Sequence, residues 1–175
     1  MSLDVTSWAF ALEDIPIDFT GNGKDISPPL EWSPGPQGTV CYAVIVDDPD
    51  GPRGCWVHWV VWNIREARLH QEIPREALVE TAMGPMLQGR NSFERLGYNG
   101  PCPPSGTHRY FFKVFALDAE LDLPAGSTTK ADLLAAMEGH ILDEGELMVT
   151  YCRSRSLTYG KLTGPYLPLT RPPRL

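Results

Sequence analysis

The stretch TVCYAVIVD, residues 39–47, is apolar at nearly every position. This pattern predicts a strand covered on both faces, because a half-exposed strand would alternate apolar and polar side chains. The run WVHWVVWNI at 56–64 repeats the pattern. Further strands are expected at 3–10, 109–118 and 146–152. The sequence therefore predicts a mainly β fold, a sandwich or a large sheet with one or two peripheral helices.

The clearest helix is expected over 130–142, where Thr129 can cap the first turn and Asp132 follows three residues on. Apolar residues recur there at helical spacing, namely Leu133, Met137 and Ile141. Gly145 is expected to stop this helix. His140 would lie on its apolar face, so we interpret it as a core or interface histidine.

A second, weaker helix or turn is expected near 75–82, after Pro74. The 17 prolines and 16 glycines are spread over the whole chain, which indicates many turns rather than one linker. The reversal at 21–23 is one of them.

The length of 175 residues suits one domain, which we expect to span 1–152. A net charge of -7 argues against nucleic-acid binding, which needs a basic face. The start MSLD shows no signal peptide, and no apolar run approaches the roughly 20 residues of a membrane span. We therefore expect a cytoplasmic protein without integral membrane association.

The last stretch, 153–175, differs in composition from the rest of the chain. It holds five Lys or Arg, four Pro and no acidic residue. We expect an extended tail outside the core sheet, docked on the body or on a partner subunit.

The four cysteines form no CxxC pair, so neither a zinc knuckle nor a disulfide framework is indicated. They are Cys41, Cys55, Cys102 and Cys152. We expect buried free thiols.

The stretch DDPDGPRGCWVHW, 47–59, sets titratable groups into apolar sequence. Asp48 and Asp50 point to a common side if the backbone stays extended, although a polar turn explains them equally well. By strand alternation His58 shares a face with Trp56 and with Val60 and Trp62, which predicts a buried position or a cleft wall. Polar groups are costly to bury without a partner, and a ligand is one candidate partner.

The loop YNGPCPPSGTHRYFF, from Tyr98, is the third candidate element. Gly100 lets the backbone approach a ligand closely, and His108 and Tyr110 share a parity in the next strand. Free N–H groups beside His and Tyr donors can make an anion cradle. A loop that merely crosses the surface is the alternative.

These motifs resemble the phosphatidylethanolamine-binding protein family, in its bacterial and archaeal branch, which is often described as Raf kinase inhibitor-like. The resemblance rests on DPDGP, WVHWVVWNI and YNGPCPPSGTHRYFFKVFALD, and is extended by ISPPLEW at 26–32, QGRNSF at 88–93 and MEGHILDEGELMVTY at 137–151. It covers residues 3–152. It implies a large central antiparallel sheet flanked by a smaller sheet and a few helices.

The resemblance also implies a pocket at one end of the fold that binds phosphate, acetate or a phospholipid head group. Its residues map to Asp48, Asp50, Trp56, His58, Gly100, Cys102, Pro104, His108 and Tyr110. Eukaryotic members carry glycine at the position of Cys102. A homodimer is expected from the bacterial branch, and a kinase or protease is a possible partner in the wider family.

We therefore expect non-enzymatic binding of a small phosphate- or carboxylate-bearing ligand or partner, with no cofactor. Asp48 would orient a histidine, and Asp50 would do the same or hold the loop. Protonation of His58 or His108 would make anion affinity rise as the pH falls from about 8 to about 6.

Two alternatives stay open at this point. One is a hydrolase that uses a His/Asp pair, with Cys102 as nucleophile because no G-x-S-x-G motif places a serine. The other is a metal site made by two histidines and two aspartates.

Overall fold

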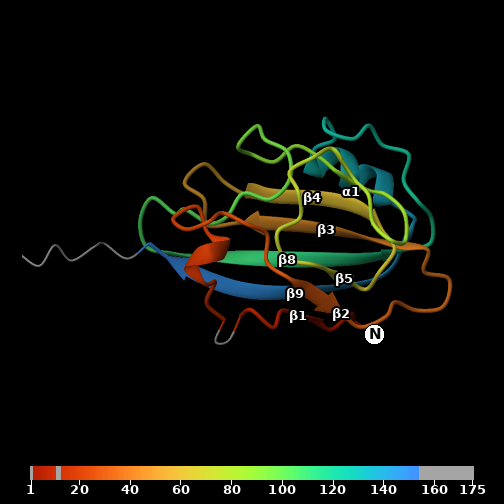
Figure 1. Cartoon of the computed structure of the whole chain (residues 1–175), viewed down its shortest axis with the longest axis horizontal. Helices are drawn as coiled ribbons and strands as arrows, with labels where there is room; N and C mark the ends of the chain where they lie inside the picture. The colour runs from red at the N-terminus through yellow and green to blue at the C-terminus, as the bar shows by residue number, and fades with distance from the viewer. Residues whose placement is uncertain (1, 11–12, 154–175) are drawn as a thin grey trace, which may run out of the picture.

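The computed structural model describes residues 2–10 and 13–153. A six-stranded antiparallel sheet of order β6-β7-β4-β3-β8-β9 forms its centre (Figure 1). Its strands are β3 (Cys41–Asp48), β4 (Trp56–Ile64), β6 (Leu78–Val79), β7 (Met86–Gln88), β8 (Thr107–Leu117) and β9 (Ile141–Cys152). A smaller sheet of order β1-β2-β5 holds β1 (Val5–Thr6), β2 (Leu30–Trp32) and β5 (Arg68–Leu69). The expected mainly β fold with two antiparallel sheets is confirmed.

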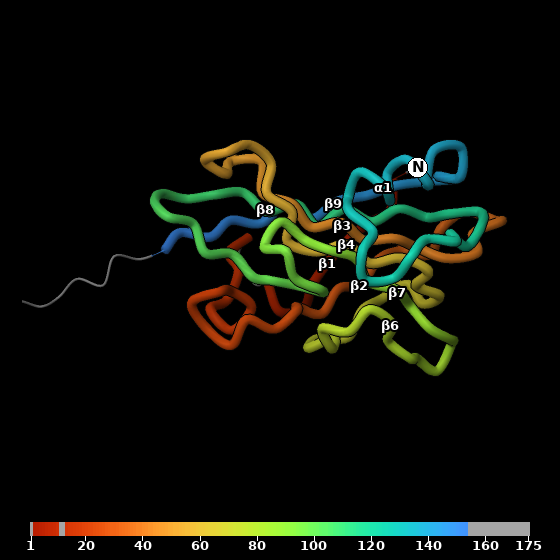
Figure 2. Tube along the Cα trace, turned by 90° about the horizontal axis from the view of Figure 1, so that it is seen from above, coloured from red at the N-terminus to blue at the C-terminus, as the bar shows by residue number. Residues whose placement is uncertain are grey.

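The central strand β3 is buried along its whole length, because both faces of the large sheet are covered. Val44 and Val46 pack toward the smaller sheet, in a cluster with Leu30 and Trp32. The intervening Ile45 packs on the other face, in a cluster that includes Val60, Trp62, Leu133 and Met137. Figure 2 shows α1 (Lys130–Met137) and the smaller sheet on opposite faces of the large sheet. The continuous apolar runs thus arise from burial on both sides.

The helix α1 begins as expected, with a reciprocal capping box between Thr129 and Asp132. It ends at Met137 instead of 142, because Gly139 adopts a φ of 83° and turns the chain into β9. Gly145, expected to stop the helix, lies inside β9. His140 is not a core residue: its side chain is 45% exposed, and Nδ1 lies 2.8 Å from Asp118 Oδ1.

Two other expectations about local structure are wrong in part. Residues 75–82 form no helix, since Leu78 and Val79 pair with β7 as a short edge strand. The strand expected at 3–10 is reduced to Val5–Thr6, which pairs with β2. A 3₁₀ turn, Ile17–Phe19, lies between β1 and β2. Each departure depends on pairing with a distant segment.

The N-terminal segment crosses the outer edge of β9. The Leu3 amide donates to Glu144 O at 3.0 Å, and the Ile15 amide donates to Thr150 O at 3.0 Å. A side chain at Gly145 would overlap the carbonyl oxygen of Leu3, so the close approach requires glycine. This crossing covers part of a long strand that, among residues 2–10 and 13–153, has no partner strand on that side.

All four cysteines are free, but only Cys41 is buried, so the expectation of buried thiols is wrong for the other three. Burial raises the pKa of the Cys41 thiol to about 11. Among the described residues, no helix is long and apolar enough to cross a membrane. The tail expected over 153–175 lies outside the described residues apart from Arg153.

Candidate functional site

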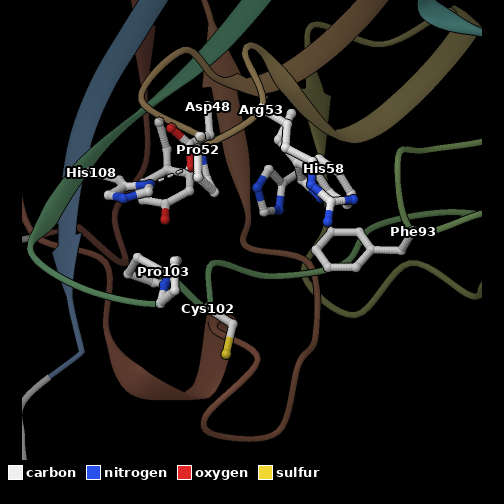
Figure 3. Close-up of a pocket in the computed structure, with 12 residues that line it drawn as sticks. Asp48, Pro52, Arg53, His58, Phe93, Cys102, Pro103 and His108 are labelled. Carbon is white, nitrogen blue, oxygen red and sulfur yellow. Dashed lines mark hydrogen bonds and ion pairs between the residues drawn. The ribbon is translucent and has the colours of Figure 1, made fainter.

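A cavity of about 320 Å³ opens at the end of the large sheet where β3 ends and β4 and β8 begin (Figure 3). The loops that precede β4 and β8 meet at this end of the molecule (Figure 2). The cavity is lined by Asp48, Gly51, Pro52, Arg53, Trp56, His58, Phe93, Cys102, Pro103, Pro104, His108 and Tyr110. Seven of the nine residues singled out in the sequence therefore line this cavity, and Asp50 and Gly100 do not.

Asp48 and His108 form the buried polar pair of the cavity. Nδ1 of His108 lies 2.7 Å from Asp48 Oδ2, and their side chains are 10% and 6% exposed. The other carboxylate oxygen accepts from the Asp50 amide at 2.8 Å. An ionised carboxylate only accepts, so Nδ1 of His108 carries a proton. Asp48 is thus placed to orient this histidine.

His58 owes its position to an irregularity of β4. Val46 pairs with Trp59 and Asp47 pairs with Val57, so His58 is the extra residue of a β-bulge. A bulge re-aims a side chain, and it interrupts the alternation of side chains that a regular strand would have. His58 consequently contacts Tyr110 instead of sharing a face with Val60 and Trp62, and that expectation is wrong.

The imidazole of His58 is fixed by one backbone carbonyl. Its Nδ1 lies 2.6 Å from Asn99 O, and because a carbonyl only accepts, Nδ1 carries the proton. Burial lowers the pKa of His58 below its usual 6.5, despite the opposing influence of the Asn99 carbonyl and nearby carboxylates. The ring is therefore neutral near pH 7. The expectation that His58 protonates between pH 8 and 6 is corrected accordingly.

Asp25 holds the loop that carries this carbonyl, although it does not line the cavity. Its Oδ1 accepts from the Gly100 amide at 2.6 Å, its Oδ2 accepts from Asn99 Nδ2 at 3.2 Å, and Arg75 pairs with it at 2.6 Å. The Gly100 amide is thus already used and is not a free donor for an anion. Glycine is needed at 100 for a different reason, since a Cβ there would lie 2.6 Å from the Thr20 Cα.

Asp50 is not among the residues that line the cavity, and it binds Arg109. The Arg109 guanidinium donates to both carboxylate oxygens, at 2.7 and 2.9 Å, and the Arg109 amide donates to Oδ2 at 2.9 Å. These bonds hold the pKa of Asp50 well below its usual range. Of its two expected roles, Asp50 therefore has the one of holding the loop between β3 and β4.

Aromatic rings make most of the remaining wall. The His58 ring meets Phe93 and Tyr110 edge-on, with centroids 5.3 Å apart in each case. Trp56 packs edge-on against Phe93 at 5.4 Å. Burial raises the pKa of Tyr110 far above its usual 10, so its hydroxyl stays protonated. The cavity thus offers a few polar atoms in an otherwise apolar setting.

Five lining residues were not singled out in the sequence, namely Gly51, Pro52, Arg53, Phe93 and Pro103. All lie inside quoted motifs, so motif membership was the available signal. Among the described residues, Arg53 is the one Lys or Arg in the wall. Cys102 also lines the cavity, but no hydrogen bond joins its thiol to a histidine within the described part of the chain. The described residues hold no group of three or more His, Cys, Asp or Glu arranged for a metal ion.

Comparison with known sequences gives one consistent result. The family model described as "Phosphatidylethanolamine-binding protein" matches residues 6–152. A UPF0098 protein of Methanothermobacter thermautotrophicus is 45% identical over 79% of this chain and 91% of its own length. A UPF0098 protein of Archaeoglobus fulgidus is 42% identical over 81% of this chain, and the match spans only 48% of that relative.

Two crystal structures share the architecture. One is a phosphatidylethanolamine-binding protein homologue, CT736, from Chlamydia trachomatis, with a TM-score of 0.76 and 36% identity over 87% of this chain and 99% of the other. The second is E. coli YbcL, described as a new member of the mammalian PEBP family, with a TM-score of 0.79 and 32% identity over 88% of this chain and 100% of the other.

Proposed function

Because this chain belongs to the phosphatidylethanolamine-binding protein family, we propose that its cavity binds a small phosphate- or carboxylate-bearing ligand without catalysing a reaction. One observation carries the proposal. The cavity is lined by the Asp48–His108 pair together with the neutral His58, Tyr110 and Arg53. A few convergent polar groups in an apolar cavity are typical of small-molecule sites.

An anion in this cavity meets both attraction and repulsion. A unit charge 4 Å from the Asp48 carboxylate would be opposed by about 4 kcal/mol at an effective dielectric constant near 20. Asp48 already accepts hydrogen bonds from His108 and the Asp50 amide, which draw its charge away from the cavity. Arg53 and a protonated His108 would supply compensating charge, and the Tyr110 hydroxyl would donate a hydrogen bond.

The hydrolase alternative receives less support. A nucleophile needs a base within hydrogen-bond reach, and the described contacts include none between Cys102 and His58 or His108. The family resemblance adds finer elements to our proposal: a phospholipid head group or phosphorylated partner as the carrier of the anion, a kinase or protease as partner, a homodimer, and a cytoplasmic location.

Calorimetric titration with inorganic phosphate tests the proposal. We expect saturable binding to the wild type, and at least about tenfold weaker binding to His108→Ala and to Tyr110→Phe, since each loses a polar group of the wall. His140→Gln, a surface substitution outside the cavity, is the control and should bind as the wild type does. Equal affinity of all four proteins would refute the site. Turnover of nitrophenyl esters that disappears in His108→Ala would favour the hydrolase.

A further inference from the structure

We infer that the cavity selects oxyanions that still carry a proton, namely hydrogen phosphate and the monoanions of phosphomonoesters, over oxyanions that carry none. This inference rests on the proposed function and narrows its ligand class, because it disfavours the carboxylates and the phosphodiester of an intact phospholipid that the proposed function admits. The selection depends on which nitrogen of the His58 ring carries the proton, because this decides whether a ligand must donate a hydrogen bond to the ring or accept one from it.

The free ring nitrogen of His58 is a hydrogen-bond acceptor. Nδ1 is committed as a donor to Asn99 O at 2.6 Å, so the neutral ring has its lone pair on Nε2. The ring lines the cavity (Figure 3), and within the described residues Nε2 has no partner of its own. A ligand that reaches Nε2 must therefore donate a hydrogen bond to it.

The surrounding structure prevents this arrangement from reversing. The Asn99 amide donates to His58 O at 3.0 Å, which ties the same two residues together a second time. The Asn99 side chain is held by Asn91 at 2.9 Å and by Asp25 at 3.2 Å. Asn99 O consequently cannot turn away, and Nδ1 cannot give up its proton without leaving a buried carbonyl unpaired.

The charge state of the ring points the same way. The carboxylates of Asp48, Asp25 and Asp47 and the Asn99 carbonyl favour protonation, but burial outweighs them and keeps the pKa of His58 below 6.5. The aromatic rings of Phe93 and Tyr110 cover the imidazole on two sides. His58 is thus an acceptor near neutral pH, and not a cation that would attract any anion.

His108 presents the same kind of atom while it is neutral. Its Nδ1 is committed as a donor to Asp48, which leaves Nε2 as the acceptor. Protonation of His108 would turn this second Nε2 into a donor, whereas His58 would remain an acceptor. The discrimination is therefore assigned to His58.

Few oxyanions can meet this demand near neutral pH. A phosphomonoester loses its second proton at a pKa of about 6, so a fraction still carries a P–OH group that can donate to Nε2. Its remaining oxygens can accept from the Tyr110 hydroxyl and Arg53. Sulfate, phosphodiesters and ionised carboxylates have acceptors only, and placing an acceptor against Nε2 leaves both atoms unsatisfied.

Methyl phosphate and dimethyl phosphate make a matched pair of probes. Near pH 6 dimethyl phosphate is a monoanion without a proton, whereas about half of the methyl phosphate is a monoanion of similar size that still carries one. Calorimetric titration of the wild type should give at least tenfold tighter binding of methyl phosphate than of dimethyl phosphate or sulfate, equivalent to about 1.4 kcal/mol. Equal affinity for methyl and dimethyl phosphate would overturn the inference while leaving the proposed function standing.

His58→Gln tests the residue itself, because the introduced amide can turn an N–H toward the ligand. We expect the preference for methyl phosphate to shrink to within about threefold through a gain of dimethyl phosphate and sulfate binding, a gain that mere structural damage would not produce. His140→Gln should keep the wild-type ratio. Retention of that ratio in folded His58→Gln would also overturn the inference. If this variant does not fold, the wild-type ratio decides, and failure of every probe to bind overturns inference and proposed function together.

Discussion

Replacing Asp48 by asparagine should move the proton of His108 from Nδ1 to Nε2. The carboxylate now accepts two hydrogen bonds, from the Asp50 amide at 2.8 Å and from His108 Nδ1 at 2.7 Å. An amide of the same shape has one oxygen, which can keep the first bond, and one NH₂ group, which would point an N–H donor at Nδ1. Both groups are satisfied only if the histidine moves its proton to Nε2, which points a donor away from the substituted side chain.

The expected loss of stability follows from the change in bond type. Hydrogen bonds to a charged group contribute about 1.5–3 kcal/mol, and neutral ones contribute about 0.5–1.5 kcal/mol. Two bonds change class, and the variant is spared the desolvation of a buried charge, so we expect a net loss of about 1–2 kcal/mol. For a chain of this length, that corresponds to a fall in Tm of about 2–8 °C.

Two measurements check this prediction. Urea unfolding gives the stability, and long-range ¹H–¹⁵N correlation spectra show which nitrogen of His108 carries the proton. Asp50→Asn is the matched control: because its pair with Arg109 is partly exposed, its loss should lower the unfolding midpoint less than Asp48→Asn does and should leave the proton of His108 on Nδ1. An unchanged Nδ1–H signal together with an unchanged unfolding midpoint in Asp48→Asn would refute the reasoning.

Three further predictions concern stability. Gly145→Ala should displace the N-terminal crossing, because the new Cβ overlaps Leu3 O, and should lower the urea midpoint by the equivalent of about 1 kcal/mol or more. Since the native His58 ring stays neutral at pH values where the unfolded chain takes up a proton, the free energy of unfolding should fall as the pH drops below about 6.5. Urea titrations between about pH 5 and 7 should show a flatter dependence for His58→Gln; an identical slope contradicts the assignment. Thr129→Ala removes the side-chain bond to the Asp132 amide and should cost about 1 kcal/mol, which Thr129→Ser should largely restore.

The long strands and the helix start were predictable from local sequence. Residues 41–48 and 56–64 are mostly apolar because two layers cover them. The start of the helix is predictable because the Thr129 side chain caps it locally. The short strands β5, β6 and β7 cannot be predicted locally, because each is only two or three residues long and exists through pairing with another segment. The spacing of Leu133, Met137 and Ile141 predicts a helix longer than the observed one, because Gly139 turns the chain before this repeat is complete.

Most residues of the candidate site could be predicted from the sequence, but the contacts that position them could not. Spacing and motif brought Asp48, His58 and His108 to attention, and they line one cavity. Sequence spacing could not show that a bulge re-aims His58, because the bulge is defined by the register with β3. Nor could it reveal Asp25, whose carboxylate binds a loop 75 residues further along the chain.

The crossing of the N-terminal segment over β9 has a consequence for self-association. An outermost strand of a sheet presents unpaired backbone groups to which another chain can add. Here Leu3 and Ile15 donate hydrogen bonds to that margin, at Glu144 O and Thr150 O. A variant that lacks residues 1–15 would keep the cavity-lining residues but would expose the outer edge of β9. It should then oligomerise or form fibrils through strand addition. The N-terminal segment thus protects the edge of β9 against such self-association.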